Sequence, residues 1–171
     1  MSRTAKRVIS VFILIGALLV SACSVVHSPP GTETTVILLR HADRTAPFDE
    51  LNEKGVARAQ ALPAAVADLD IDVIYSPDRK RNLQTVAPLI DQHSIELRVV
   101  DILGAGPRLI EENPGKTVMW VGNTDNLQTI YGEMGGKDEP PVIYGEIFIM
   151  TIGEDGPPKI EKRNFGGKGT P

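Results

Sequence analysis

The stretch from Thr35 to Thr45, Thr-Val-Ile-Leu-Leu-Arg-His-Ala-Asp-Arg-Thr, decides how this chain of 171 residues is interpreted. Val36 to Leu39 form an uninterrupted apolar run, which is typical of a buried strand. Arg40 and His41 follow at the carboxyl end of that strand. Because ligands of open α/β sheets bind at the carboxyl ends of the strands, we expect these two side chains to lie in a ligand site.

Short apolar runs alternate with helical patterns over the rest of the chain. The predicted strands cover residues 71–75, 95–100, 117–121, 145–152 and 159–164, and the predicted helices cover about 53–69, 80–92, 107–113 and a segment through 127–131. Asn52 is a suitable N-cap for the first helix, which Pro63 is expected to kink or restart. The alternation predicts one α/β domain, residues 34–171, with a largely parallel sheet. Its last two strands are joined by a short turn and must pair antiparallel, so the sheet is mixed.

Polar residues follow three of the predicted strands, namely Arg40-His41, Ser76 with the basic run Arg79–Arg81 beyond it, and Gly122-Asn123. If these strands are parallel neighbours, all three sets of side chains lie at the same edge of the sheet. The helices that begin after Ser76 and after Asn123 add backbone N–H groups and the positive ends of their dipoles. The sequence therefore predicts a phosphate site in an otherwise acidic protein.

Three segments, in this order, resemble the signature of the histidine phosphatase superfamily, also called the phosphoglycerate-mutase-like family. Leu38–Ala42 resembles its Leu-x-Arg-His-Gly/Ala motif, Leu51–Gly55 its Leu-Thr/Asn-x-x-Gly helix start, and Tyr75–Thr85 its Ser-Ser-Asp-Leu-x-Arg-Ala-x-Gln-Thr segment. The resemblance extends from about residue 35 to residue 166. It implies a three-layer α/β/α sandwich with a mostly parallel mixed sheet, of the small kind that lacks a large cap.

The resemblance also implies the roles of the site residues. His41 corresponds to the nucleophile that becomes a phosphohistidine, and Arg40 and Arg81 correspond to the arginines that hold the phosphoryl oxygens. Arg81 takes this role because it lies four residues before Thr85, where the family's arginine stands, while Arg79 and Lys80 are expected to be solvated or to face the substrate. The residue types suit the chemistry, since a neutral imidazole is a nucleophile and guanidinium groups stabilise negative charge on the phosphoryl oxygens.

Asn123 departs from the family's pattern. The family has a second histidine after the strand that ends in Val-Val-Gly, and here Val121-Gly122 is followed by asparagine. An asparagine can donate a hydrogen bond to a phosphoryl oxygen, but it carries no charge and supplies no proton. For the general acid, Asp43 is the leading candidate, ahead of Glu111 and Glu112 on the short helix.

The first 22 residues are predicted to be a signal peptide. Three basic residues precede the apolar run Val8–Val20, which is too short to be a typical membrane span. Val20–Cys23 resembles the lipobox of bacterial lipoproteins, which implies cleavage before Cys23 and lipid on that residue. The alternatives are an uncleaved N-terminal anchor or a plain secretory signal with an incidental cysteine.

A lipidated tether over residues 23–33 is predicted from its Pro, Ser and Gly content. The lipobox resemblance implies an exported protein anchored to a bacterial membrane at its periplasmic face, and Ser24 after the cysteine implies the outer membrane if the cell is Gram-negative. The first 22 residues carry three basic residues and no acidic one, so cleavage takes the net charge from −4 to about −7. This acidic balance argues against a nucleic-acid partner.

Two functions follow from these observations. The first is a lipid-anchored extracytoplasmic phosphohydrolase that acts on phosphomonoesters or phosphorylated side chains through a phosphohistidine at His41. The second is a pseudophosphatase that binds a phosphorylated ligand or partner without turnover, because of Asn123; within this second class a structural envelope protein with a relict pocket is the lesser alternative. We expect no cofactor and no metal site, since the three histidines lie far apart and Cys23 is assigned to lipidation.

Overall fold

The computed structural model describes residues 25–167, so the predicted signal peptide and Cys23 lie outside the described residues. One six-stranded sheet has the order β3-β2-β4-β1-β5-β6. Its central strand β1 pairs parallel with β4 on one side and antiparallel with β5 on the other. Its strands are β1 (Thr34–Arg40), β2 (Val73–Ser76), β3 (Glu96–Val99), β4 (Thr117–Gly122), β5 (Glu146–Ile152) and β6 (Lys159–Asn164).

The predicted pairing of the strands is confirmed. β2 is parallel to β3 and β4, so the strands that precede Arg40-His41, Ser76 and Asn123 are parallel neighbours. β5 and β6 are antiparallel, as their short connection required. β3 is at the edge of the sheet, and its residues are exposed or half-buried.

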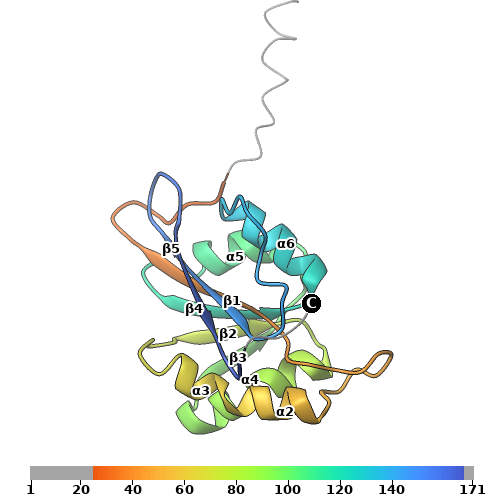
Figure 1. The fold of residues 1–171 in the computed structure, drawn as a ribbon. Helices are drawn as coiled ribbons and strands as arrows, with labels where there is room; N and C mark the ends of the chain where they lie inside the picture. Colours follow the sequence, from red (N-terminus) through yellow and green to blue (C-terminus); the bar gives the residue numbers. More distant parts are fainter. Residues whose placement is uncertain (1–24, 168–171) are drawn as a thin grey trace, which may run out of the picture.

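Helices cover both faces of the sheet, which gives the predicted three-layer sandwich (Figure 1). Helices α2 (Glu53–Gln60), α3 (Leu62–Ala65) and α4 (Lys80–His93) lie on one face, and α5 (Ala105–Glu111) and α6 (Thr124–Glu133) lie on the other. Alternate residues of β1 face the two layers: Val36 and Leu38 pack in the core under α5 and α6, and Ile37 and Leu39 pack in the core under α3 and α4. Burial of β1 on both faces explains its continuous apolar run.

Two local signals fix the start and the break of the first helical region. The Asn52 side chain accepts a hydrogen bond of 2.9 Å from the Gly55 N–H and caps α2. Pro63 lies in the first turn of α3, where its missing N–H costs no helical hydrogen bond, so the chain restarts a helix there as predicted.

The described part of the predicted tether, residues 25–33, contacts the domain. Ser28 is buried, its hydroxyl donates to the Ile152 carbonyl at 2.7 Å, and its N–H donates to the Gly153 carbonyl at 2.9 Å. The Val26 N–H donates to the Glu133 carbonyl at 2.9 Å. These contacts hold the segment along the domain just before β1 begins.

Candidate active site

The carboxyl ends of β1, β2 and β4 converge at one edge of the sheet. Arg40, the last residue of β1, is opposite Gly122, the last residue of β4, and the His41 N–H donates to the Gly122 carbonyl at 2.9 Å. The next residue, Ala42, donates its N–H to the Thr85 hydroxyl of α4 at 2.8 Å. The loop after β1 is therefore fixed against both β4 and the helix that follows β2.

His41 is buried, with 2% of its surface exposed. Its Nδ1 lies 2.8 Å from the Ala42 carbonyl oxygen. A carbonyl oxygen only accepts hydrogen bonds, so Nδ1 carries the proton and Nε2 keeps its lone pair. The pKa of His41 is lowered to about 4, mainly by burial; the bond to the Ala42 carbonyl opposes this shift, and the nearby Arg40 and Arg81 contribute to it. At neutral pH this imidazole is uncharged and has the electronic state of a nucleophile.

Arg40 is held from the β5 side by the segment that precedes that strand. Its guanidinium donates to the Val142 carbonyl at 2.6 Å and to the Tyr144 hydroxyl at 3.3 Å. The guanidinium carbon also lies 4.1 Å from the centre of the Tyr144 ring, and the same ring lies 5.6 Å from the imidazole of His41. Within residues 25–167 the buried Nε of Arg40 has no hydrogen-bond partner.

Arg81 reaches the same edge from the first turn of α4. Its Nε donates to the Asn123 side-chain oxygen at 2.8 Å, and its Nη1 forms an ion pair with Asp49. Arg79, two residues earlier, is exposed, which agrees with its predicted position in solvent or toward a substrate. The structure therefore brings Arg40, His41, Arg81 and Asn123 together, as the sequence predicted.

Asn123 immediately precedes α6, and its backbone N–H donates to the side-chain oxygen of Asn126 at 3.0 Å. Because its own side-chain oxygen accepts from the Arg81 cation, its amide nitrogen is directed away from Arg81 and keeps both N–H groups as donors. The side chain is half-buried at the site. It can thus donate to a bound anion, but it adds no positive charge.

The geometry does not support Asp43 as a general acid. Its carboxylate is buried and accepts from the Arg58 Nε at 2.5 Å, and it also pairs with the Lys54 ammonium at 3.2 Å. Burial alone would raise the pKa of Asp43, but the hydrogen bonds from Arg58 and Lys54 overcome that effect and lower it. A carboxyl group held ionised in this way is an anchor for α2 and has no proton to donate at neutral pH.

Glu111 and Glu112 are also unsuited to that role. Both are exposed, and Glu112 pairs with Arg108 one turn earlier in the same helix. The carbonyl of the next residue, Asn113, accepts from the hydroxyl of Thr34 at 3.2 Å. Because Thr34 is the first residue of β1, these glutamates lie toward the edge of the sheet opposite His41.

Sequence reasoning missed three residues around the site: Tyr144, Asp49 and Arg58. Tyr144 lies outside the quoted motifs, and the packing of its ring depends on the antiparallel placement of β5 beside β1. Asp49 lies in the loop between two motifs, where a charged residue looks solvated. The sequence did contain a signal for Arg58: it stands one helical turn after Lys54 on α2, and both side chains pair with the Asp43 carboxylate.

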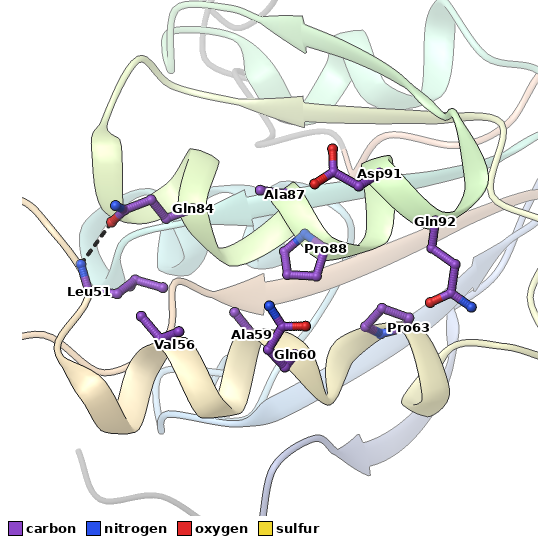
Figure 2. Close-up of a pocket in the computed structure, with 10 residues that line it drawn as sticks. All are labelled: Leu51, Val56, Ala59, Gln60, Pro63, Gln84, Ala87, Pro88, Asp91 and Gln92. Atoms are coloured by element: carbon purple, nitrogen blue, oxygen red, sulfur yellow. Dashed lines mark hydrogen bonds between the residues drawn. The ribbon is translucent and has the colours of Figure 1, made fainter.

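Two hollows deserve comparison. An open cleft of about 630 Å³ beside the site is lined by Arg81 and Asn123 together with Arg79, Asp101 and Ile102, among others. A groove of about 540 Å³ lies between α2 and α4 (Figure 2). Its walls are mainly Ala, Pro, Val and Gln side chains and, unlike those of the first hollow, include neither Arg81 nor Asn123. The first hollow is therefore the one that adjoins the side chains predicted to bind phosphate.

Within residues 25–167 no group of three or more histidine, cysteine, aspartate or glutamate side chains is arranged to hold a metal ion. The same residues contain no helix of the length and apolar character that a membrane crossing requires.

The mixed sheet with helices on both faces, and a buried histidine flanked by arginines at the carboxyl ends of its parallel strands, define a phosphoglycerate-mutase-like α/β domain. Residues 36–104 match the family model described as the histidine phosphatase superfamily (branch 1). This match begins in β1 and ends just before α5, so it includes Arg40, His41 and Arg81. No curated protein matches the chain in sequence.

Solved structures of this fold resemble the chain over most of its length. The protein histidine phosphatase SixA complexed with tungstate has a TM-score of 0.63 at 15% identity, with 76% of this chain and 96% of that chain covered. YhfR of Bacillus stearothermophilus has a TM-score of 0.62 at 17% identity, with 74% and 95% covered. A phosphoglycerate mutase from Bacillus anthracis has a TM-score of 0.57 at 13% identity, with 77% and 93% covered. At these identities the likeness establishes the shared fold.

Proposed function

We propose that this protein is a phosphohydrolase of the histidine phosphatase type, which acts on phosphomonoesters or phosphorylated side chains through a phosphohistidine at His41. The observation that carries the proposal is the state of His41: it is buried and neutral, and its Nδ1–H is held by the Ala42 carbonyl. This arrangement leaves the Nε2 lone pair to attack phosphorus.

The chemistry proceeds in two displacements. The Nε2–P bond forms while the P–O bond to the leaving group breaks, and that oxygen takes a proton from solvent or from the substrate's surroundings. Water then attacks the phosphoryl group, the P–N bond breaks, and inorganic phosphate leaves. Arg40 and Arg81 would stabilise the negative charge that accumulates on the phosphoryl oxygens, and preorganised donors of this kind are a large share of the catalysis of phosphoryl transfer.

The class of substrate is supported by the open site and by the compared structures. The cleft beside Arg81 and Asn123 has room for a leaving group and is open to solvent. One of the proteins with the same fold is described as a protein histidine phosphatase. A phosphorylated small molecule or a phosphoprotein therefore fits this site as a partner.

Asn123 supports a second candidate function, a pseudophosphatase that binds a phosphorylated ligand without turnover. Asn123 gives the site a neutral amide where the family pattern has a second histidine, so one charge-assisted contact to the phosphoryl group is lost. By analogy with the removal of one oxyanion donor, this costs about 10²–10³ in rate. Binding through Arg40 and Arg81 would survive such a loss.

The proposal includes a lipid anchor on Cys23, which would place the domain at the periplasmic face of a bacterial membrane. The lipobox-like sequence supports it, and the contacts of Val26 and Ser28 with the domain would then hold the body close to the lipid. A test is metabolic labelling with a radioactive fatty acid in a bacterial host. We expect label on the wild type and none on Cys23→Ser; equal labelling of both would contradict the anchor.

Turnover is tested with the purified full-length protein in detergent and a generic aryl phosphate. The variants are His41→Ala, Asn123→His and, as a control for loss of an imidazole elsewhere, His93→Ala. We expect turnover by the wild type and by His93→Ala, and none by His41→Ala. If the turnover rate of the wild type equals that of His41→Ala while Asn123→His turns over substrate, the phosphohydrolase proposal is refuted and the pseudophosphatase proposal is supported. Acid-labile phosphate on His41 would be independent support for the mechanism.

A further inference from the structure

Asp49 binds the groups that an incoming phosphate needs. One carboxylate oxygen forms the ion pair with Nη1 of Arg81, and the other accepts the N–H of Lys80 at 3.1 Å. Lys80 is the first residue of the 14-residue helix α4. A guanidinium and a helix N-terminal N–H are the usual partners of a bound phosphate, and here an internal carboxylate occupies both.

The carboxylate is charged and reachable. Although burial alone would raise the pKa of Asp49, the hydrogen bonds from Lys80 and Arg81 lower it. Its side chain is 39% exposed, while that of Arg81 is 17% exposed. The cation is thus enclosed by the site, and the anion approaches it from the solvent side.

The loop that carries Asp49 is fixed at its base and exposed at its tip. Arg44 and Leu51 form an antiparallel bridge, and the Leu51 N–H donates to the Gln84 side chain of α4 at 2.9 Å. Between them Phe48, next to Asp49, is exposed. Asp49 can therefore leave Arg81 by a local movement of the tip, while the base of the loop stays paired.

We propose that Asp49 is an internal competitor of the phosphoryl group, which holds Arg81 until a phosphorylated ligand displaces it. This inference rests on the proposed phosphate site and deepens it. Because Asp49 acts through Arg81, it is a gating and positioning residue and not a catalytic one. Its presence weakens the binding of free oxyanions and favours ligands whose remaining atoms add contacts in the neighbouring cleft.

The test measures the binding of inorganic phosphate to the purified full-length protein by calorimetry. Asp49→Asn keeps the shape of the side chain but removes its charge, and we expect it to tighten binding about three- to tenfold, as suits a partly exposed ion pair. The matched control is Glu50→Gln at the neighbouring position. It also removes one negative charge, but from an exposed ion pair with Lys80, so it should change the phosphate affinity much less. A purely structural role for Asp49 predicts the opposite sign, namely weaker binding.

A double variant locates the effect. In an Arg81→Ala background, Asp49→Asn should change phosphate affinity by less than about twofold, since the competing contact is gone. Unchanged or weaker binding by Asp49→Asn, in a protein whose wild type binds phosphate, would overturn the competitor role and leave the proposed function intact. Absence of phosphate binding in the wild type and in every variant would remove the phosphate site itself, and both proposals with it.

Discussion

Replacement of His41 by glutamine should make folding stability less sensitive to pH. The native His41 is enclosed by the sheet edge and by Arg40 and Tyr144, and burial lowers its pKa to about 4. In the unfolded chain an imidazole has a pKa of about 6.5. Between these two values the unfolded state binds a proton that the native state does not bind, so acidification favours unfolding.

The size of the effect follows from the two pKa values. The contribution of neutral His41 to the free energy of unfolding is fully present above pH 6.5. It decreases as the pH falls and is lost once the pH has passed through about 4. Proton linkage with pKa values of 6.5 and about 4 gives a loss of about 2 kcal/mol between pH 7 and pH 5, and of about 3 kcal/mol by pH 4. His41→Gln has no proton to bind and should lack this component.

The assay is urea unfolding at pH 7 and pH 5, followed by the fluorescence of Trp120, the single tryptophan and a fully buried one. The control is His93→Gln, which removes an exposed imidazole at the end of α4. Between pH 7 and pH 5 we expect the free energy of unfolding to fall by about 2 kcal/mol more in the wild type and in His93→Gln than in His41→Gln. Carboxylates also titrate there, but all three proteins share them, so the difference isolates His41. Equal losses in wild type and His41→Gln, or an NMR titration of His41 centred near pH 6.5, would refute the neutral, buried nucleophile.

Three further predictions concern the surroundings of the nucleophile. Arg58→Ala leaves the buried Asp43 carboxylate without its main partner and should cost about 3–5 kcal/mol in urea unfolding, and a loss below about 1 kcal/mol would show that the pair is dispensable. Gly55→Ala places a Cβ 2.0 Å from the Asp43 carbonyl oxygen and should cost about 1–3 kcal/mol in the same measurement, whereas a neutral effect would mean that α2 moves freely against the loop. Asn123→His should raise kcat on an aryl phosphate by about 10²–10³, and a rise below about threefold would show that position 123 does not limit turnover.

The fold was predictable because its signals are local and agree with one another. The apolar run of β1, the cap at Asn52 and the restart at Pro63 each depend on a few neighbouring residues, and each was confirmed. Parallel pairing then brings Arg40-His41 and Asn123 to one edge, since both strands end in register. The convergence of the site is thus a consequence of topology, which the alternation of strands and helices already indicates.

The partners of the site residues could not be predicted in the same way. Asp43 looked like an acid because it stands two residues from His41, but the packing of α2 presents Arg58 to it across a sequence separation of 15 residues. Tyr144 stacks on Arg40 from a separation of 104 residues. A motif fixes which chemical groups are near each other along the chain, whereas the pKa of a carboxylate depends on cations that arrive from elsewhere in the fold.

The two unusual features of this site, Asn123 and Asp49, have a common electrostatic basis. A neutral amide oxygen at position 123 can accept the Nε–H of Arg81, whereas a protonated imidazole there would repel the same cation. Arg81 is therefore turned so that its Nε faces Asn123 while its Nη1 meets the Asp49 carboxylate. Because Asn123 is neutral, it adds no second cation beside Arg81, and the Asp49 carboxylate balances the charge of Arg81. If phosphate binds as proposed, Asn123 gives it one charged contact fewer than the histidine of the family pattern would, and Asp49 competes for Arg81. Asn123 and Asp49 should therefore be varied together when activity is sought.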